Sequence, residues 1–217
     1  MRLTRQIACF CIFAAANLVL GVAARAESQS QFSRVEVRGL LSIEVPRHWD
    51  AKDADTRANL SASAEALSGI ASHVSSLAIS SLPRPTAAII RVSRTASDGL
   101  TQSGLRAAAA NTAQFLRDAE AEMSESFAQM DANIKKLGGA LLQKPAVSLD
   151  TIDGRTAMVI SYRRVDANGT TFFVRQFHVP LTAEKALITI SNREHDAILY
   201  KPILERVLRS IDFDVGQ

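Results

Sequence analysis

The longest hydrophobic pattern in the chain predicts a helical segment over residues 101–137. Along it, apolar or small residues return every three or four positions, as on one face of a helix: Leu105, Ala109, Thr112, Leu116, Ala119, Met123, Phe127, Met130, Ile134 and Leu137. Gly138 and Gly139 predict its end, because glycine readily adopts the left-handed conformation that stops a helix. Such a helix would be about 50 Å long, whereas a compact chain of this size has a radius of gyration of about 16 Å. It therefore either bends, near residues 110–113 or 124–126, or projects.

A second pattern, in which apolar residues alternate with polar ones or form short β-branched runs, predicts strands on both sides of that helix. These strands cover residues 32–37, 41–45, 77–82, 87–93, 141–148, 156–164, 170–179 and 186–191. Asn168 and Gly169 predict a hairpin between two of them, because both residues tolerate a positive φ. Pro145 predicts an edge position or a bulge in its strand.

Shorter helices are predicted before and after these segments. Pro202 suits the first position of a helix, where its missing N–H costs nothing, and so predicts a helix over residues 203–210. Asp55 or Thr56 would cap a helix within residues 50–72, although the many small residues there suit an irregular segment equally well.

The order of these elements predicts the fold class. Strands 156–164 and 172–179 carry apolar residues at both odd and even positions, whereas a sheet wetted on one face would alternate cleanly. Layers are therefore expected on both faces. We predict an α+β fold, with a central and largely antiparallel β-sheet sandwiched between helices.

The first 26 residues have the pattern of a secretion signal. Arg2 and Arg5 precede an apolar stretch, and Ala24 and Ala26 place small residues at −3 and −1 of a cleavage site before Glu27. The alternative is an uncleaved membrane anchor. Cleavage would leave a short flexible start at 27–31, a single domain over 32–213 and a tail at 214–217, in the bacterial periplasm or outside the cell.

Removal of this leader changes the charge and the cysteine content. The chain has 25 basic and 22 acidic residues, and three of the basic ones lie in the leader, so 22 of each remain. A neutral body gives no electrostatic support for nucleic-acid binding. Both cysteines, Cys9 and Cys11, also lie in the leader, which excludes disulfides, a thiol nucleophile and cysteine-bound metals from the rest.

The succession of motifs resembles the PsbP/DcrB-like superfamily. A strand ends in Pro46-x-x-Trp49, a central helix and the Asn168-Gly169 hairpin follow, and the chain closes with Tyr200-x-Pro202 and a helix that ends before Phe213. The resemblance covers residues 32–213. It implies a sheet between helices and a non-catalytic binding or assembly role, with an envelope protein as partner.

No motif predicts catalysis, a cofactor or a metal. The four histidines, His48, His73, His178 and His195, lack the spacing of a metal site. Glu194, His195 and Asp196 are adjacent, and they are better explained as a polar entry to a helix, with Asp196 as a cap, than as a catalytic pair.

One set of charged residues is a candidate for recognition. Arginine binds carboxylates and other planar anions well, and four arginines lie on or beside the predicted hairpin: Arg155, Arg163, Arg164 and Arg175. The interpretation as a partner or anion patch competes with a second one, in which these are solvated side chains balanced by Asp150 and Asp166.

Three functional hypotheses follow. The first is an exported binding or assembly module of the cell envelope, with no enzymatic activity. The second is an envelope hydrolase, which requires at least two of His48, His178, His195 and the acidic residues to meet in one pocket and to have perturbed pKa values. The third is a subunit that oligomerises through the long helix, which requires an exposed apolar stripe along residues 116–137.

Overall fold

The computed structural model describes residues 31–60, 76–81, 87–97 and 99–213. They form a two-stranded hairpin and an eight-stranded sheet in which every pair is antiparallel. The strands are β1 (Phe32–Val37), β2 (Leu41–Pro46), β3 (Asp50–Ala51), β4 (Leu77–Ser80), β5 (Ala88–Ala96), β6 (Ala140–Leu141), β7 (Ala146–Ile152), β8 (Arg155–Val165), β9 (Thr171–Pro180) and β10 (Glu184–Arg193). The helices are α3 (Gln102–Ala110), α4 (Thr112–Glu122), α5 (Ser124–Lys136), the short 3₁₀ helix η1 (Glu194–Asp196) and α6 (Ala197–Arg209).

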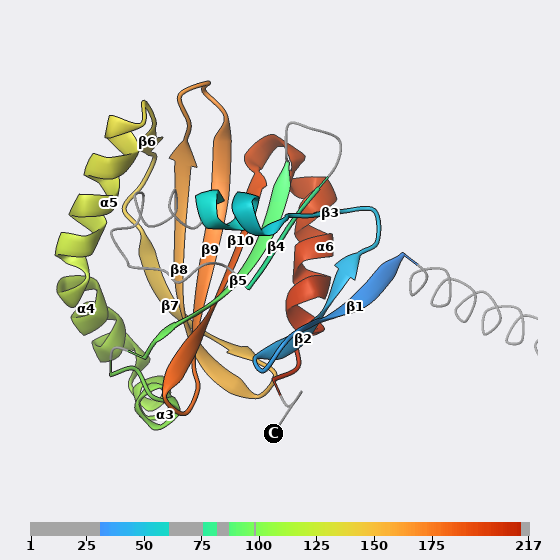
Figure 1. Cartoon of the computed structure of the whole chain (residues 1–217). Helices are drawn as coiled ribbons and strands as arrows, with labels where there is room; N and C mark the ends of the chain where they lie inside the picture. Colours follow the sequence, from blue (N-terminus) through green and yellow to red (C-terminus); the bar gives the residue numbers. More distant parts are fainter. Residues whose placement is uncertain (1–30, 61–75, 82–86, 98, 214–217) are drawn as a thin grey trace, which may run out of the picture.

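The large sheet lies between two layers. Its order is β3-β4-β5-β10-β9-β8-β6, and β7 also pairs with β8. Helices α4 and α5 lie on one side of it and α6 on the other (Figure 1). The predicted fold class, an α+β sandwich around an antiparallel sheet, is confirmed.

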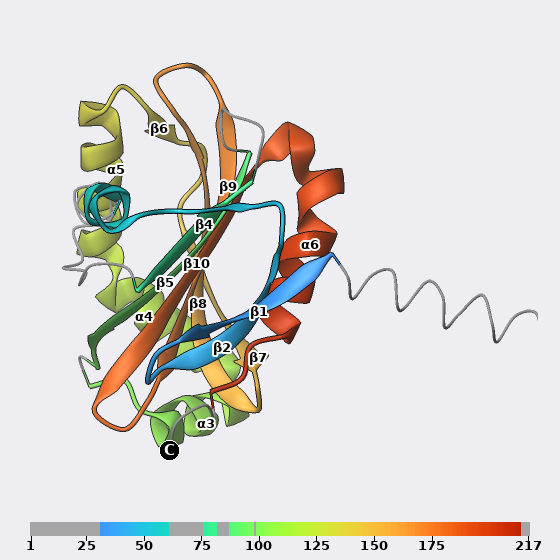
Figure 2. The ribbon, with the colours of Figure 1, turned by 45° about the vertical axis from the view of Figure 1, so that its right-hand side comes forward.

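Helix α6 and the β1–β2 hairpin together cover one face of the sheet (Figure 2). Leu41 and Ile43 of the hairpin pack with Leu204 and Val207 of α6 against inward residues of β5, β8, β9 and β10, among them the fully buried Phe177. The end of α6 is tied to the hairpin, because the Ser210 hydroxyl accepts a hydrogen bond from the Glu44 amide at 2.8 Å. The hairpin and the helix thus act as one layer.

The second core lies under α4 and α5. Ala119, Phe127, Met130 and Ile134 of these helices pack with Val147, Ile160, Tyr162 and Val174 of the sheet. The predicted apolar stripe is therefore covered, and of its large residues only Leu137 is exposed. The exposed stripe that the third hypothesis required is thus not present in the described residues.

The long helical segment bends instead of projecting. Asn111, with φ −134° and ψ 59°, separates α3 from α4, and Met123 separates α4 from α5. Both breaks lie at or beside the predicted positions. Asn111 suits the first break because asparagine competes for backbone hydrogen bonds outside helices. The bends let α4 and α5 follow the sheet.

Two predicted elements have different bounds in the structure. The strand expected over residues 141–148 is split into β6 and β7, with Pro145 in the gap, and both parts pair with β8. Helix α6 begins at Ala197, so Pro202 lies inside it rather than at its start. A proline there deprives the Ile198 carbonyl of its helical donor, and this is tolerated because Ile198 is exposed to water.

The helix expected after residue 50 starts with a different cap from the two that were predicted. Residues 54–60 are helical, and the Asp53 carboxylate accepts a hydrogen bond from the Thr56 amide at 2.7 Å. That hydrogen bond lowers the pKa of Asp53. The remainder of this segment, the predicted leader with its cleavage site and the tail lie outside the described residues.

Gly139 gives a direct test of how closely α5 approaches the sheet edge. A Cβ atom at this position would meet the Val165 carbonyl oxygen and lie 3.1 Å from Cγ2 of Ile134. We expect Gly139→Ala to lower the free energy of unfolding by about 1–3 kcal/mol through overpacking. The exposed control Lys136→Ala should change it by less than about 0.5 kcal/mol. Urea unfolding followed by fluorescence of Trp49, the single tryptophan, measures both, and equal stabilities would contradict the close approach.

Candidate functional site

A hollow of about 370 Å³ lies between residues 197–205 of α6 and the sheet. Strands β9 and β10 form its floor, η1 closes one end, and α6 forms one wall. On α6 the lining positions are 197, 201, 204 and 205, which share one face of a helix. The full lining is Phe173, Arg175, Ile190, Asn192, Glu194, Ala197, Lys201, Leu204 and Glu205.

The floor of this hollow is apolar and the rim is charged. Ile190 and Leu204 are buried beneath it, with Leu204 only 2% exposed. Most of the rim charges are already paired. Arg163 donates to Glu194 at 2.6 Å, and Arg175 donates to Glu205 at 3.0 Å and to Asp150 at 3.1 Å.

Arg175 is the centre of this rim. Its guanidinium group lies 4.7 Å from the centre of the Phe177 ring and bridges a residue of β7 and a residue of α6. Its side chain is only one-fifth exposed, so its two ion pairs are better shielded from water than most surface pairs. Arg175 therefore holds the α6 wall at a set distance from the sheet.

Two residues of α6 differ from this paired rim. Lys201 is exposed, and within the described parts of the chain it has no ion pair. Ile198 is 95% exposed and its neighbour Leu199 is 61% exposed. Ile198, Lys201 and Glu205 follow the i, i+3, i+7 spacing, so they lie along one side of the helix. An apolar side chain in water thus stands beside the hollow.

A second, more open hollow adjoins the first. It has a volume of about 480 Å³ and is lined by the β8–β9 turn and by η1: Asn168, Gly169, Thr170, Thr171, Glu194 and His195. Glu194 lines both hollows. The concave surface therefore continues from α6 past η1 to the hairpin that the sequence predicted.

The four predicted arginines do not form one patch. Arg163 and Arg175 are diagonal neighbours on the α6 face of β8 and β9, and both reach the hollow or its partners. Arg164 points to the opposite face, 4.8 Å from the centre of the Phe172 ring. Arg155 lies at the other end of β8, 5.4 Å from the centre of the Phe213 ring.

The predicted helix-entry cluster and Trp49 both occupy places that the packing of the fold explains. Glu194, His195 and Asp196 form η1 immediately before α6, and Nε2 of His195 lies 3.2 Å from Oδ2 of Asp196. Asp196 occupies the N-cap position of α6, although its side chain makes no capping hydrogen bond. Trp49 is buried against Tyr200, with ring centres 6.0 Å apart, and belongs to the core on the α6 side of the sheet.

A third cavity, of about 520 Å³, lies beneath α4 on the other face. His178, which is 2% exposed, lines it together with the buried Lys185. Asp118, Glu122 and Ser126 come from α4 and α5. A histidine and two acids therefore line one pocket, which is the first of the two conditions of the hydrolase hypothesis. Asp118 accepts a hydrogen bond from Gln114 at 2.7 Å.

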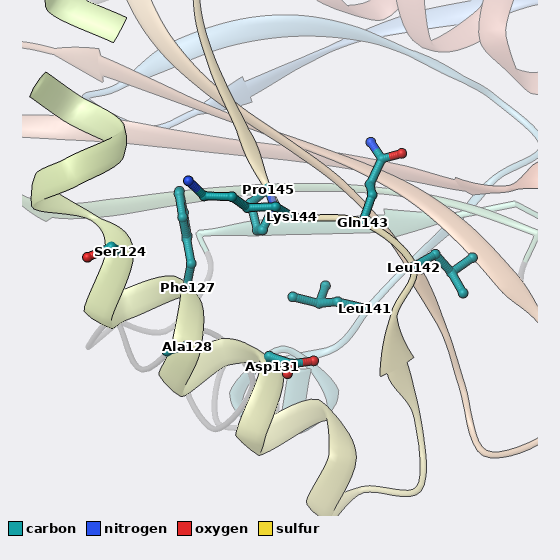
Figure 3. Close-up of a pocket in the computed structure, with 9 residues that line it drawn as sticks. All are labelled: Ser124, Phe127, Ala128, Asp131, Leu141, Leu142, Gln143, Lys144 and Pro145. Atoms are coloured by element: carbon teal, nitrogen blue, oxygen red, sulfur yellow. The ribbon is translucent and has the colours of Figure 1, made fainter. Parts of the chain in front are cut away.

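Figure 3 shows a fourth concavity, an open groove of about 360 Å³ between α5 and the chain that joins β6 to β7. Leu141 lies between the helix and this connection, with Phe127 on the helix side. Its charged residues have nearby partners: Asp131 pairs with Lys135 at 2.6 Å, and Lys144 lies 3.9 Å from Glu120. The groove thus lies where the predicted strand over residues 141–148 is divided into β6 and β7.

In the described ranges, no group of three or more histidine, cysteine or acidic side chains is placed to hold a metal ion. No helix in the same ranges is long and apolar enough to cross a membrane. His73 lies outside the described residues.

Comparison with known proteins finds likeness in fold only. No family model and no curated protein matches the chain. Among solved structures, the cyanobacterial PsbP of Synechocystis sp. PCC 6803 is 12% identical and has a TM-score of 0.48, over 84% of this chain and 92% of that one. The Ran-binding protein Mog1p of Saccharomyces cerevisiae is 14% identical, with a TM-score of 0.41, over 84% and 95%.

A third neighbour comes from Mycobacterium tuberculosis. LpqN, which is involved in cell envelope biogenesis, is 12% identical and has a TM-score of 0.41, over 83% of this chain and 89% of that one. Structures of the PsbP-like fold, which the order of elements in the sequence resembles, are thus among the neighbours of this chain.

If Arg175 links α6 to the sheet, its replacement should lower the free energy of unfolding more than replacement of Arg34 does. Arg175→Gln should lower the free energy of unfolding by about 1–3 kcal/mol, because it removes charged hydrogen bonds to two acids from a mostly buried position. Arg34→Gln, which removes an exposed pair with Asp212 at 3.3 Å, should cost less than about 1 kcal/mol. Urea unfolding compares the two variants. Equal losses would show that Arg175 is an ordinary surface arginine.

Proposed function

We propose that this protein is an exported binding or assembly module of the cell envelope and that it has no catalytic activity. In this proposal the leader is removed after Ala26, and residues 32–213 act as a single unit in the periplasm or outside the cell. Its contact surface is the hollow beside α6, with Arg163 and Arg175 as members of the rim.

The observation that carries this proposal is the 95% exposed Ile198 beside an apolar hollow. Large aliphatic side chains contribute free energy when they are removed from water, about 1.5–3 kcal/mol each. A contiguous apolar surface with a polar rim is the usual form of a protein-binding site. The paired rim charges suit this role, because ion pairs formed in advance hold the wall of the hollow in place.

The opposite side of the molecule supports the same assignment. Most apolar residues of α4 and α5 are buried in the core. The exposed large apolar residues on that side are Leu137, which is 58% exposed, and Leu142, which is 46% exposed and lines the groove between α5 and the β6–β7 connection. Leu137 serves as the control for Ile198.

A second candidate function is an envelope hydrolase, and one observation favours it. The cavity beneath α4 brings His178 together with Asp118, Glu122 and Ser126, the residue types of a nucleophile, a base and an orienting acid. The purified chain would then hydrolyse some member of a panel of chromogenic esters, amides and phosphate esters. The activity would be lost in His178→Gln and kept in His195→Gln, and this result would replace the binding module by an enzyme.

The binding proposal predicts both export and a partner. Expressed with its own leader in a Gram-negative host, the chain should appear in the periplasm with Glu27 as its first residue. From envelope extracts of the organism that encodes it, the tagged protein should recover a reproducible partner. Ile198→Ser should reduce that recovery about tenfold, in line with the loss of one buried aliphatic side chain, while Leu137→Ser should not.

Two results would count against this proposal. Retention of residues 1–26 in a membrane fraction would show an anchor in place of a cleaved leader. Failure to recover any reproducible partner with the unaltered chain, or equal recovery with Ile198→Ser and Leu137→Ser, would remove the α6 surface as the binding site.

A further inference from the structure

We propose that the hollow beside α6 binds a protein segment in which an apolar side chain adjoins a carboxylate, and that Lys201 pairs with that carboxylate. This inference rests on the proposed function and names the chemistry of the partner. The apolar side chain would enter the hollow, and the carboxylate would lie at its rim.

The apolar part of the inference follows from the floor. Phe173, Ile190, Ala197 and Leu204 face a volume of about 370 Å³, which lies within the range of binding pockets. Ile190 and Leu204 already belong to the core. An inserted aliphatic or aromatic side chain would therefore continue the packing of the core outward without requiring new buried polar groups.

The charge of the partner follows from the ion pairs among the charged side chains of the rim. Glu194 is held by Arg163, and Glu205 is held by Arg175, which Asp150 also shares. Neither acid is thus left to attract a cation. Lys201 lines the same hollow, is exposed, and has no ion pair within the described ranges. Arg175 is shared by two acids, so with Lys201 the rim is neutral overall. Lys201 is the rim cation that no acid contacts within the described ranges, so the complementary group at this position is an anion.

The exposed part of α6 extends the contact beyond the hollow. Ile198 lies one turn before Lys201 on the same side of the helix, and Leu199 follows it. A segment anchored in the hollow would cover Ile198 with its next apolar residue. Such a contact is more extensive than a single small ligand would make.

The same charges disfavour a lipid surface as the occupant. Glu194, Asp196 and Glu205 lie around the hollow or at the start of α6. Glu194 and Glu205 are paired with arginines, which leaves Lys201 as the unpaired cation of the rim. A single lysine raises the affinity for an anionic bilayer only about fivefold, or about 1 kcal/mol, which is too little to hold the protein there. A protein segment can place one carboxylate on Lys201 and leave the acids to their arginines.

The inference is tested by selection from a library of randomised dodecapeptides displayed on phage, with the full chain as target. Parallel selections use Lys201→Glu and the matched control Lys136→Glu, an exposed lysine on α5. Enriched peptides should contain a large apolar residue next to Asp or Glu. Synthetic copies should bind Lys201→Glu about fivefold more weakly or worse, as expected for one ion pair, and Lys136→Glu as tightly as the unaltered chain.

Selection on Lys201→Glu should shift the enriched residue from Asp or Glu to Lys or Arg. Replacement of the apolar residue of a selected peptide by Ser should weaken binding about tenfold. Peptides that bind all three proteins equally would place their site elsewhere and overturn the inference, and so would a failure to enrich any peptide. A preference for anionic vesicles, reversed by Lys201→Glu, would assign the site to lipid instead.

These outcomes are separable from those of the proposed function. One outcome is recovery of an envelope partner in a way that depends on Ile198 but not on Lys201. That result would support the binding module and rule out the acidic segment as its ligand. Recovery that depends on neither Ile198 nor Lys201 would rule out both the α6 binding surface and the acidic segment.

Discussion

The structure depends on one constraint, which is that β8 and β9 are apolar on both faces. Phe177 and Val159 face one side, and Val174 and Ile160 face the other. Burying both faces removes far more apolar area from water than covering one would. The sheet therefore needs two layers, and the chain supplies α4 and α5 for one face and α6 with the β1–β2 hairpin for the other.

The two layers meet this constraint unequally, and the inequality creates the candidate site. On one face the apolar stripe of α4 and α5 is almost wholly covered. On the other face Leu204, Val207 and Leu208 bury the second half of α6, and hydrogen bonds from the Arg206 guanidinium and the Glu44 amide fasten that end. Beside the hollow, Arg163 pairs with Glu194 of η1 and Arg175 pairs with Glu205 of α6, and Ile198 is exposed. Leu204 belongs both to the core and to the lining of the hollow, so the candidate site adjoins the core directly.

Much of the fold could be predicted because it rests on local patterns. The spacing of apolar residues predicted the α3–α5 region and the places where it could bend, and the double-sided strands predicted the two layers. Asn168 and Gly169 predicted the hairpin correctly. The start of α6 could not be predicted from Pro202, because a proline inside a helix is tolerated only where the orphaned carbonyl reaches water, and that is a property of the folded chain. Because the helix was predicted to start at Pro202, Ala197, Ile198 and Lys201 were assigned to a loop and not to α6.

The site was less predictable, since it depends on how strand faces are oriented. Arg163 and Arg164 are adjacent in sequence and point to opposite sides of the sheet. Of the four arginines, two therefore lie at the rim, and the other two lie elsewhere, over the rings of Phe172 and Phe213. Likewise, no spacing in the sequence indicated that His178 would share a cavity with Asp118 and Glu122, because these residues come from elements on different layers. Pairing between arginines and acids more than 20 residues away was also beyond the local pattern.

The central claim is that the α6 face, and not the α5 face, contacts the partner. It is tested most directly in living cells of the organism that encodes the chain, by photo-crosslinking from a benzophenone amino acid placed at position 198 or, as the matched control, at position 137. We predict a discrete adduct from position 198 and none from position 137. An adduct from position 137 alone, or the same adducts from both positions, would contradict the claim.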